Sequence, residues 1–173
     1  MKRLLYLLFT ILLCSCSFRR DYNTLYIDDY KFSIGYDDVN YLKVVFDVDI
    51  KDELEVDETV ENVEVRLFNK IFCTVDISNN KDKIIDSGEC IISKLTLYCL
   101  DVGNRDFKIN DVWLDSSVKS NCKKLNGTYI ERNGYACVVE ENKNNALHVI
   151  ELHGDILNMD QDKLDHIILY IKQ

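Results

Sequence analysis

The sequence predicts an all-β fold, arranged as a two-sheet β-sandwich that contains disulfide bonds. Short runs of alternating or β-branched residues recur along the chain, and clusters of Asn, Asp and Gly separate them. No helical repeat of about 10 to 15 residues lies between these runs, which favours a sandwich of antiparallel or mixed sheets. The runs expected to form strands are 42–50, 60–68, 71–77, 91–100, 128–139, 147–152 and 166–171. A short helix is expected near residues 160–164.

The strongest local prediction is a β-hairpin near residue 133. Asn133 and Gly134 stand between two strand-like runs, at 128–130 and 135–139. Asn-Gly readily supplies the positive φ that both central positions of a type I′ turn require. We therefore expect two adjacent antiparallel strands in this part of the chain.

The first residues predict an exported protein. Met1-Lys2-Arg3 precedes an apolar run over residues 4–13, the pattern of a signal peptide with a charged region and a short hydrophobic region. A membrane-spanning helix needs roughly 20 apolar residues, so this run is interpreted as a cleaved leader and not as an anchor. We expect a leader over residues 1–17 and a single secreted β-sandwich domain over residues 18–173.

The chain is acidic, with a formal net charge of -9 at pH 7. Such a charge argues against nucleic acid as a partner and favours a basic protein. Residues 47–64 carry a dense run of carboxylates, and Lys51 is the only basic residue among them. The candidate partner-binding residues of this acidic loop are Asp52, Glu53, Glu55, Asp57, Glu58 and Glu61. The loop would steer a cationic ligand in a salt-sensitive manner; the alternative is a solvated loop with no partner.

Cysteines beyond the leader predict disulfide bonds, because exported proteins meet oxidising surroundings. The candidates are Cys73, Cys90, Cys99, Cys122 and Cys137, with Cys16 as a sixth if it survives cleavage. Cys90 and Cys99 cannot bond to each other across an extended strand, since nine steps of about 3.3 Å exceed the ~7 Å limit between Cα atoms. The sequence leaves the partner of each cysteine open.

Nothing in the sequence indicates catalysis, a metal or a cofactor. The sequence lacks the CxxC spacing of structural zinc, the EF-hand order and the GxSxG and HExxH motifs. Alternation along a strand from 147 to 153 would place His148 and His153 on opposite faces, where they could not readily share a metal. We expect a binding module and not an enzyme. Asn126 opens the sequon Asn-Gly-Thr and is a candidate glycosylation site.

Three segments resemble one known family in the same order. In "ECIISKLTLYC" the two cysteines bracket a strand, "CKKLNGTYIERNGYAC" encloses a second strand, and "YLKVVFDVDIKDE" leads into the acidic loop. This pattern resembles the secreted poxvirus immune-evasion β-sandwich family, which includes viral chemokine-binding proteins and the chemokine-binding domain of viral tumour-necrosis-factor receptors. The resemblance covers about residues 41–139. It implies a secreted, non-catalytic immunomodulator that sequesters a host chemokine or another basic cytokine, with the acidic loop on the binding surface.

A second interpretation starts from residues 13–16. Leu13-Cys14-Ser15-Cys16 resembles a bacterial lipobox, in which Cys16 would become the lipidated first residue. The protein would then be a bacterial surface lipoprotein that carries a β-sandwich binding domain of unknown ligand on a lipid anchor. The secreted interpretation, in contrast, predicts no membrane contact.

Overall fold

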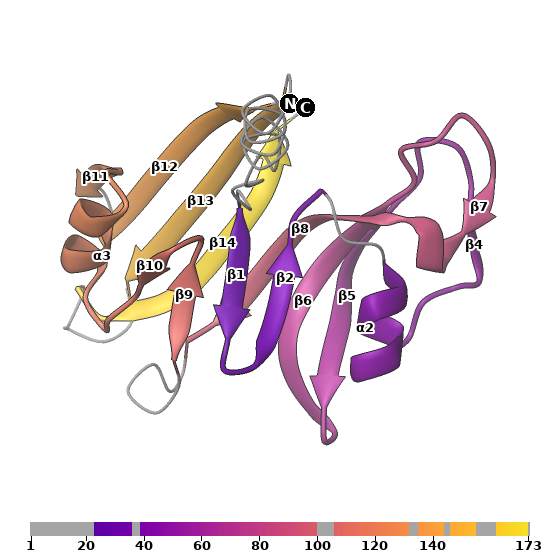
Figure 1. The fold of residues 1–173 in the computed structure, drawn as a ribbon, viewed down its shortest axis with the longest axis horizontal. Coiled ribbons are helices and arrows are strands. Elements are labelled where there is room, and N and C mark those ends of the chain that lie inside the picture. Colours follow the sequence, from indigo (N-terminus) through magenta and orange to yellow (C-terminus); the bar gives the residue numbers. More distant parts are fainter. Residues whose placement is uncertain are drawn as a thin grey trace, which may run out of the picture.

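The computed structural model describes residues 23–35, 39–99, 106–131, 135–143, 146–154 and 162–172. Within these ranges the fold is built mainly from antiparallel strands, gathered into sheets of eight, four and two strands (Figure 1). The predicted all-β fold class is therefore confirmed.

The eight-stranded sheet runs through the whole molecule in the order β11-β12-β13-β14-β8-β6-β5-β3. Its strands are β11 (Thr128–Glu131), β12 (Tyr135–Lys143), β13 (Ala146–Gly154), β14 (Leu164–Lys172), β8 (Ile91–Tyr98), β6 (Lys70–Ser78), β5 (Thr59–Leu67) and β3 (Asp47–Val48). The last strand of the chain, β14, lies between β13 and β8. It therefore joins the two halves of the sheet.

A four-stranded sheet lies in front of the larger one, in the order β10-β9-β1-β2 (Figure 1). Its strands are β1 (Thr24–Ile27), β2 (Tyr30–Ser33), β9 (Phe107–Ile109) and β10 (Val112–Trp113). The sequence analysis does not predict them, because two to four residues are too few to display alternation. The β1–β2 turn contains Asp28 at a φ of 52°, where Asn or Gly is the usual signal.

The hydrophobic core joins the two sheets. Fully buried side chains alternate along the strands, as expected for sheets with one inner face. They include Leu25, Ile27 and Ile109 of the smaller sheet and Leu152, Ile167 and Leu169 of the larger one. These side chains belong to one continuous apolar cluster. Each buried Leu or Ile contributes about 1.5–3 kcal/mol through the hydrophobic effect, so the cluster is the main source of stability.

The predicted strand at 42–50 is wrong over its first part, because helix α2 spans Val39–Val45. Leu42 and Phe46 are buried, whereas Val44 is 85% exposed. Residues spaced by three or four share one face of a helix, so the apolar residues of this segment follow a helical repeat as well as the alternation that suggested a strand. The finding also corrects the early strand that the poxvirus resemblance implies for "YLKVVFDVDIKDE".

A second helix, α3, spans Val118–Lys124 and packs against β12. Its N-terminus is capped by Ser117, whose hydroxyl accepts a hydrogen bond from the backbone N–H of Ser120 at 3.1 Å. This helix is absent from the sequence predictions. The helix expected near 160–164 is wrong over its described part, because Asp162 lies in a turn, Lys163 forms an isolated β-bridge with Ser117 and Leu164 begins β14.

The other predicted strands are confirmed as β5, β6, β8, β11, β12, β13 and β14. β11 and β12 form the predicted antiparallel hairpin, with Glu131 opposite Tyr135. The Asn133-Gly134 turn itself lies outside the described residues.

Candidate functional site

The predicted acidic loop contains β4 (Glu53–Leu54), which pairs with β7 (Ile85–Asp86) as a separate two-stranded sheet. Five of its six predicted binding residues are exposed: Asp52, Glu53, Glu55, Asp57 and Glu61. Leu54, between two of these carboxylates, is fully buried. The loop is thus an exposed acidic surface held to the core by an apolar anchor.

Asn79 fixes the backbone of this loop. Its side chain is almost fully buried, and its Nδ2 donates to the carbonyl oxygens of Leu54 at 3.1 Å, Glu55 at 2.8 Å and Lys83 at 2.8 Å. Because these are backbone contacts, they set the path of the loop and leave its carboxylates available.

The sixth predicted residue, Glu58, has a structural role. Its carboxylate accepts hydrogen bonds from the Lys51 ammonium and from the backbone N–H of Glu55, the latter at 2.8 Å. These bonds, that of Lys51 first, lower the pKa of Glu58 below its ordinary value. Glu58 therefore stabilises the loop, and its charge is partly neutralised.

A groove of about 320 Å³ lies along β5 beside the acidic loop. The carboxylates of Asp47, Asp49, Glu61 and Glu64 line it, together with the Arg66 guanidinium. Arg66 forms an ion pair with Glu64, so the other three carboxylates dominate the charge of the groove. Loop and groove together form one acidic surface, which we call the acidic edge.

The groove follows an open edge of the eight-stranded sheet. β3 pairs with β5 only through Asp47 and Val48, opposite Arg66 and Val65. Within the described part of the chain, residues 59–64 of β5 therefore have no strand partner on that side. An open strand edge offers unpaired backbone groups to an added strand.

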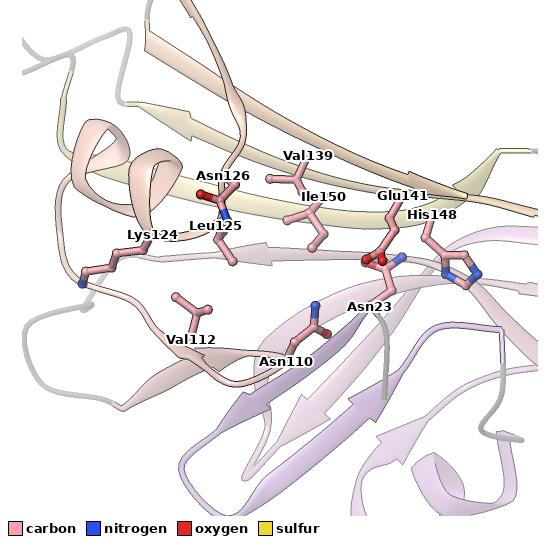
Figure 2. Close-up of a pocket in the computed structure, with 10 residues that line it drawn as sticks. All are labelled: Asn23, Asn110, Val112, Lys124, Leu125, Asn126, Val139, Glu141, His148 and Ile150. Atoms are coloured by element: carbon pink, nitrogen blue, oxygen red, sulfur yellow. The ribbon is translucent and has the colours of Figure 1, made fainter. Parts of the chain in front are cut away.

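A second concavity lies toward the other end of the sheet order, where α3 and the turn after it meet β12 and β13 (Figure 2). This pocket has a volume of about 170 Å³. Its apolar walls are Val112, Leu125, Val139 and Ile150. We call it the α3 pocket.

Polar groups gather at one end of the α3 pocket. Asn23, Glu141 and His148 lie there in Figure 2, and the last two are opposite each other in the β12–β13 register. Asn23 is almost fully buried, and its Nδ2 donates to the backbone oxygen of Tyr170 at 3.1 Å. Its Oδ1 is buried and accepts no hydrogen bond from the described residues.

The other end of the α3 pocket carries Lys124, Asn110 and Asn126. The Lys124 ammonium donates to the Asp115 carboxylate at 2.8 Å and to the backbone oxygen of Trp113 at 3.1 Å. Its charge is therefore compensated within the protein, and Lys124 contributes little attraction for an anion at this end of the pocket.

The histidines follow the predicted alternation. His148 is buried on the inner face of β13, and His153 lies on the outer face. His153 stacks on His166 of β14, with ring centroids 4.4 Å apart, a pairing that cannot be predicted without the strand register. The Glu151 carboxylate is hydrogen-bonded to Nε2 of His153 at 2.9 Å, and the Asp165 carboxylate is hydrogen-bonded to Nδ1 of His166 at 2.8 Å. Among the described residues no group of three or more His, Cys, Asp or Glu side chains could hold a metal ion.

All five cysteines in the described residues are buried thiols. Cys90 and Cys99 directly precede and follow β8, as expected. Cys122 of α3 and Cys137 of β12 lie close enough for their thiols to share a hydrogen bond. Burial, and then this contact with the Cys122 thiol, raise the pKa of Cys137. Disulfide formation stays a prediction, and this contact identifies one candidate pair.

The remaining sequence predictions concern the glycosylation site and the leader. Asn126 is exposed in the turn after α3 and lines the α3 pocket, so a glycan there would stand at its mouth. Residues 1–17 and Cys16 lie outside the described residues. In the part of the chain that the structure describes, no helix has the length and apolar character to span a membrane.

Sequence reasoning misses the α3 pocket entirely, because its residues are widely separated along the chain. One signal was present: Glu141 follows Cys137 and Val139 at alternate positions of a strand, so it shares their inner face. A carboxylate at such a position indicates a polar site at the end of a sheet.

Comparisons with protein-family models, curated proteins and solved structures give no match to this chain.

Proposed function

We propose that this protein is a secreted, non-catalytic binding module that captures a basic protein ligand on its acidic edge. The observation that carries the proposal is the groove along β5, in which Asp47, Asp49 and Glu61 line a concavity beside an open strand. The adjoining loop adds further exposed carboxylates.

Charge and backbone geometry would act together in binding. The carboxylates attract a cationic surface over roughly the Debye length, about 8 Å at physiological salt, and so accelerate association. The open edge of β5 then accepts an extended segment as an additional strand, with backbone hydrogen bonds that are independent of sequence. Association would consequently depend strongly on salt.

The resemblance to the poxvirus family supports a host chemokine or another basic cytokine as the ligand. Under this proposal the domain is a two-sheet β-sandwich, and it acts by covering the receptor-binding surface of the ligand. The mechanism is competitive sequestration, and the protein performs no chemistry.

The test is surface plasmon resonance of the secreted protein against a panel of chemokines and other cytokines. The key variant combines Asp49→Asn, Glu55→Gln and Glu61→Gln, all at exposed positions of the acidic edge. Glu58 and Glu64 remain unchanged, because they bind Lys51 and Arg66.

The matched control removes the same charge from the smaller sheet and its turns. It combines Asp28→Asn, Asp106→Asn and Asp111→Asn, which are also exposed. We expect the acidic-edge variant to associate with a basic ligand about tenfold more slowly, or slower still, and the control to associate within about twofold of the wild type. Equal rates for both variants would refute a role of the acidic edge.

The lipobox-like residues Leu13-Cys14-Ser15-Cys16 support a second candidate, a bacterial surface lipoprotein with the same binding domain. Intact-mass analysis of the mature protein distinguishes the two. A lipid on Cys16 supports the lipoprotein, and cleavage near residue 17 without a lipid supports the secreted protein.

A further inference from the structure

The turn between β5 and β6 places an aromatic side chain in solvent. Leu67 pairs with Lys70, so Phe68 and Asn69 form a two-residue turn, and Figure 1 shows this turn at the lower end of the molecule. Phe68 is 89% exposed, more than any other large hydrophobic residue that the structure describes. The hairpin therefore presents a phenyl ring that contributes little to the core.

The backbone of Phe68 adopts a conformation that is unfavourable for its residue type. Its φ is 51° and that of Asn69 is 63°, the two positive values that a type I′ turn requires. Asn and Gly adopt such values readily, whereas a bulky side chain is rarely found there. Backbone strain of this kind is concentrated at binding and catalytic sites. Since the exposed ring does not stabilise the turn or the core, we infer that Phe68 serves binding.

A second apolar side chain extends this surface toward the acidic edge. The β5–β6 register shifts beside Arg66, because Phe72 is an extra residue that turns inward and packs on Phe46 with ring centroids 5.4 Å apart. Ile71 consequently lies opposite Arg66 on the outer face of the sheet and is 55% exposed. Because Arg66 also lines the acidic groove, the exposed apolar side chains are continuous with that groove. We call Phe68 and Ile71 the apolar tip.

The apolar tip does not itself attract a cation, because Lys70 is exposed beside the turn and Arg66 is held in an ion pair. A basic ligand would therefore place its charges over the carboxylates of the groove and an apolar segment on the tip. Glu61 and Phe68 are seven positions apart along the hairpin, about 23 Å at 3.3 Å per residue. An extended segment of about eight residues can span both.

We propose that the apolar tip is the binding hot spot of the acidic edge, and that the partner is a basic protein with a short apolar segment next to its cationic surface. This inference rests on the proposed function, because it takes the ligand of the acidic edge as the partner. A few aromatic or aliphatic side chains usually supply most of the affinity of an interface, whereas exposed charges mainly accelerate association. The tip therefore governs the lifetime of the complex, and the groove governs its formation.

The test is a titration of the isotope-labelled full chain with two capped octapeptides, followed by amide chemical shifts. Lys-Ser-Lys-Ser-Lys-Leu-Leu-Ser, the leucine peptide, combines three cations with two apolar residues. Lys-Ser-Lys-Ser-Lys-Ser-Ser-Ser, the serine peptide, has the same charge and no leucine. We expect the leucine peptide to bind the wild type at least about fivefold more tightly and to shift resonances around Phe68 and Ile71, because its leucines bury apolar area on the tip.

Variants of the turn separate binding from folding. Phe68→Asn removes the ring and introduces a residue that a type I′ turn favours, so the midpoint of thermal unfolding should stay the same or rise while the preference for the leucine peptide disappears. Phe68→Tyr keeps an aromatic ring and should keep the preference. The matched control is Trp113→Thr, which removes an aromatic side chain that is 59% exposed on the smaller sheet and should leave the binding of both peptides unchanged.

The variant that combines Asp49→Asn, Glu55→Gln and Glu61→Gln distinguishes this inference from the proposed function. It should weaken both peptides by the same factor. A preference for the leucine peptide that survives Phe68→Asn, or equal affinity of the two peptides for the wild type, would overturn the apolar tip and leave capture by the acidic edge intact. Peptides that bind the wild type and the triple variant equally well would overturn the proposed function, and an absence of binding by either peptide would overturn both.

Discussion

The acidic edge and the α3 pocket differ in how the chain builds them. The acidic edge comes from one stretch of about twenty residues, and most of its carboxylates are exposed. The α3 pocket combines residues as distant as Asn23 and His148, and several of its side chains are buried. A surface that depends on local composition is visible in a sequence, whereas a pocket that depends on tertiary packing is not.

The two regions also differ in what stabilises them. The buried Leu54 side chain, the Asn79 amide and backbone hydrogen bonds from Ser87 to Asp52 and from Asn79 to Glu58 hold the acidic loop to the core. The wall of the α3 pocket, in contrast, is held by helix α3, whose Cys122 contacts Cys137 of β12. We therefore expect the acidic loop to respond to the loss of its Leu54 anchor, and the pocket to respond to the covalent state of its cysteines.

The largest effect is expected from Leu54→Ala. Removal of a fully buried leucine side chain costs about 2–5 kcal/mol, because the cavity is only partly refilled. We expect hydrogen exchange to accelerate at the β4–β7 pair, binding of the basic ligand to fall, and the α3 pocket to keep its protection. Uniform loss of protection in both regions would contradict the separate anchoring of the acidic edge.

A disulfide between Cys122 and Cys137 should strengthen the pocket region. Exchange with oxidised glutathione converts the two thiols into one disulfide and releases two molecules of reduced glutathione. Closing a loop of about 15 residues adds about 3 kcal/mol to the free energy of unfolding. Peptide mapping without reduction identifies the bond, and chemical denaturation before and after reduction measures the gain.

The matched control for this prediction is Cys73→Ser, since Cys73 is buried in β6 and no contact with another thiol is found for it within the described residues. This variant should still form the Cys122–Cys137 bond, whereas Cys137→Ser should not. A different pairing in the peptide map would disprove the candidate pair.

A smaller, pH-dependent effect is expected from Asp115→Asn. Burial opposes ionisation of Asp115, but hydrogen bonds from Lys124, Ser120 and the backbone of Ser117 outweigh it and lower the pKa below 3.8. Because the pKa is lower in the folded state, the charged carboxylate stabilises the fold above pH 4, and this contribution is lost as the pH falls through the folded pKa.

The Asp115 side chain is 42% exposed, so solvent screening limits this contribution to about 1 kcal/mol or less. Thermal unfolding of the wild type and Asp115→Asn should differ at pH 7 and converge as the pH falls through the folded pKa of Asp115. A difference that stays constant down to pH 2 would assign the effect to lost packing and not to charge.

Much of the eight-stranded sheet could be predicted, because strands of eight or nine residues such as β5, β6 and β13 have enough positions to display alternation. The smaller sheet could not, since its strands have two to four residues and its turns depend on Asp28 and Asn110 at positive φ. In a chain without proline, Asn and Asp make turns that Gly or Pro would otherwise signal.

The candidate sites divide in the same way. The exposed carboxylates of the acidic loop could be predicted from composition, but not the structural role of Glu58, which depends on the fold bringing Lys51 and the Glu55 N–H to one carboxylate. Segment 42–50 shows the opposite case. Its apolar residues alternate, yet its first part belongs to α2, because the tertiary core buries Val39 and Leu42 on one helical face.

The most direct test of the central claim is the association rate of the wild-type protein with a basic ligand from the cytokine panel, measured from about 50 to 500 mM salt. Capture by the acidic edge predicts a steep fall in the association rate and a nearly constant dissociation rate. An association rate that does not change with salt would contradict the claim that the acidic edge attracts the ligand.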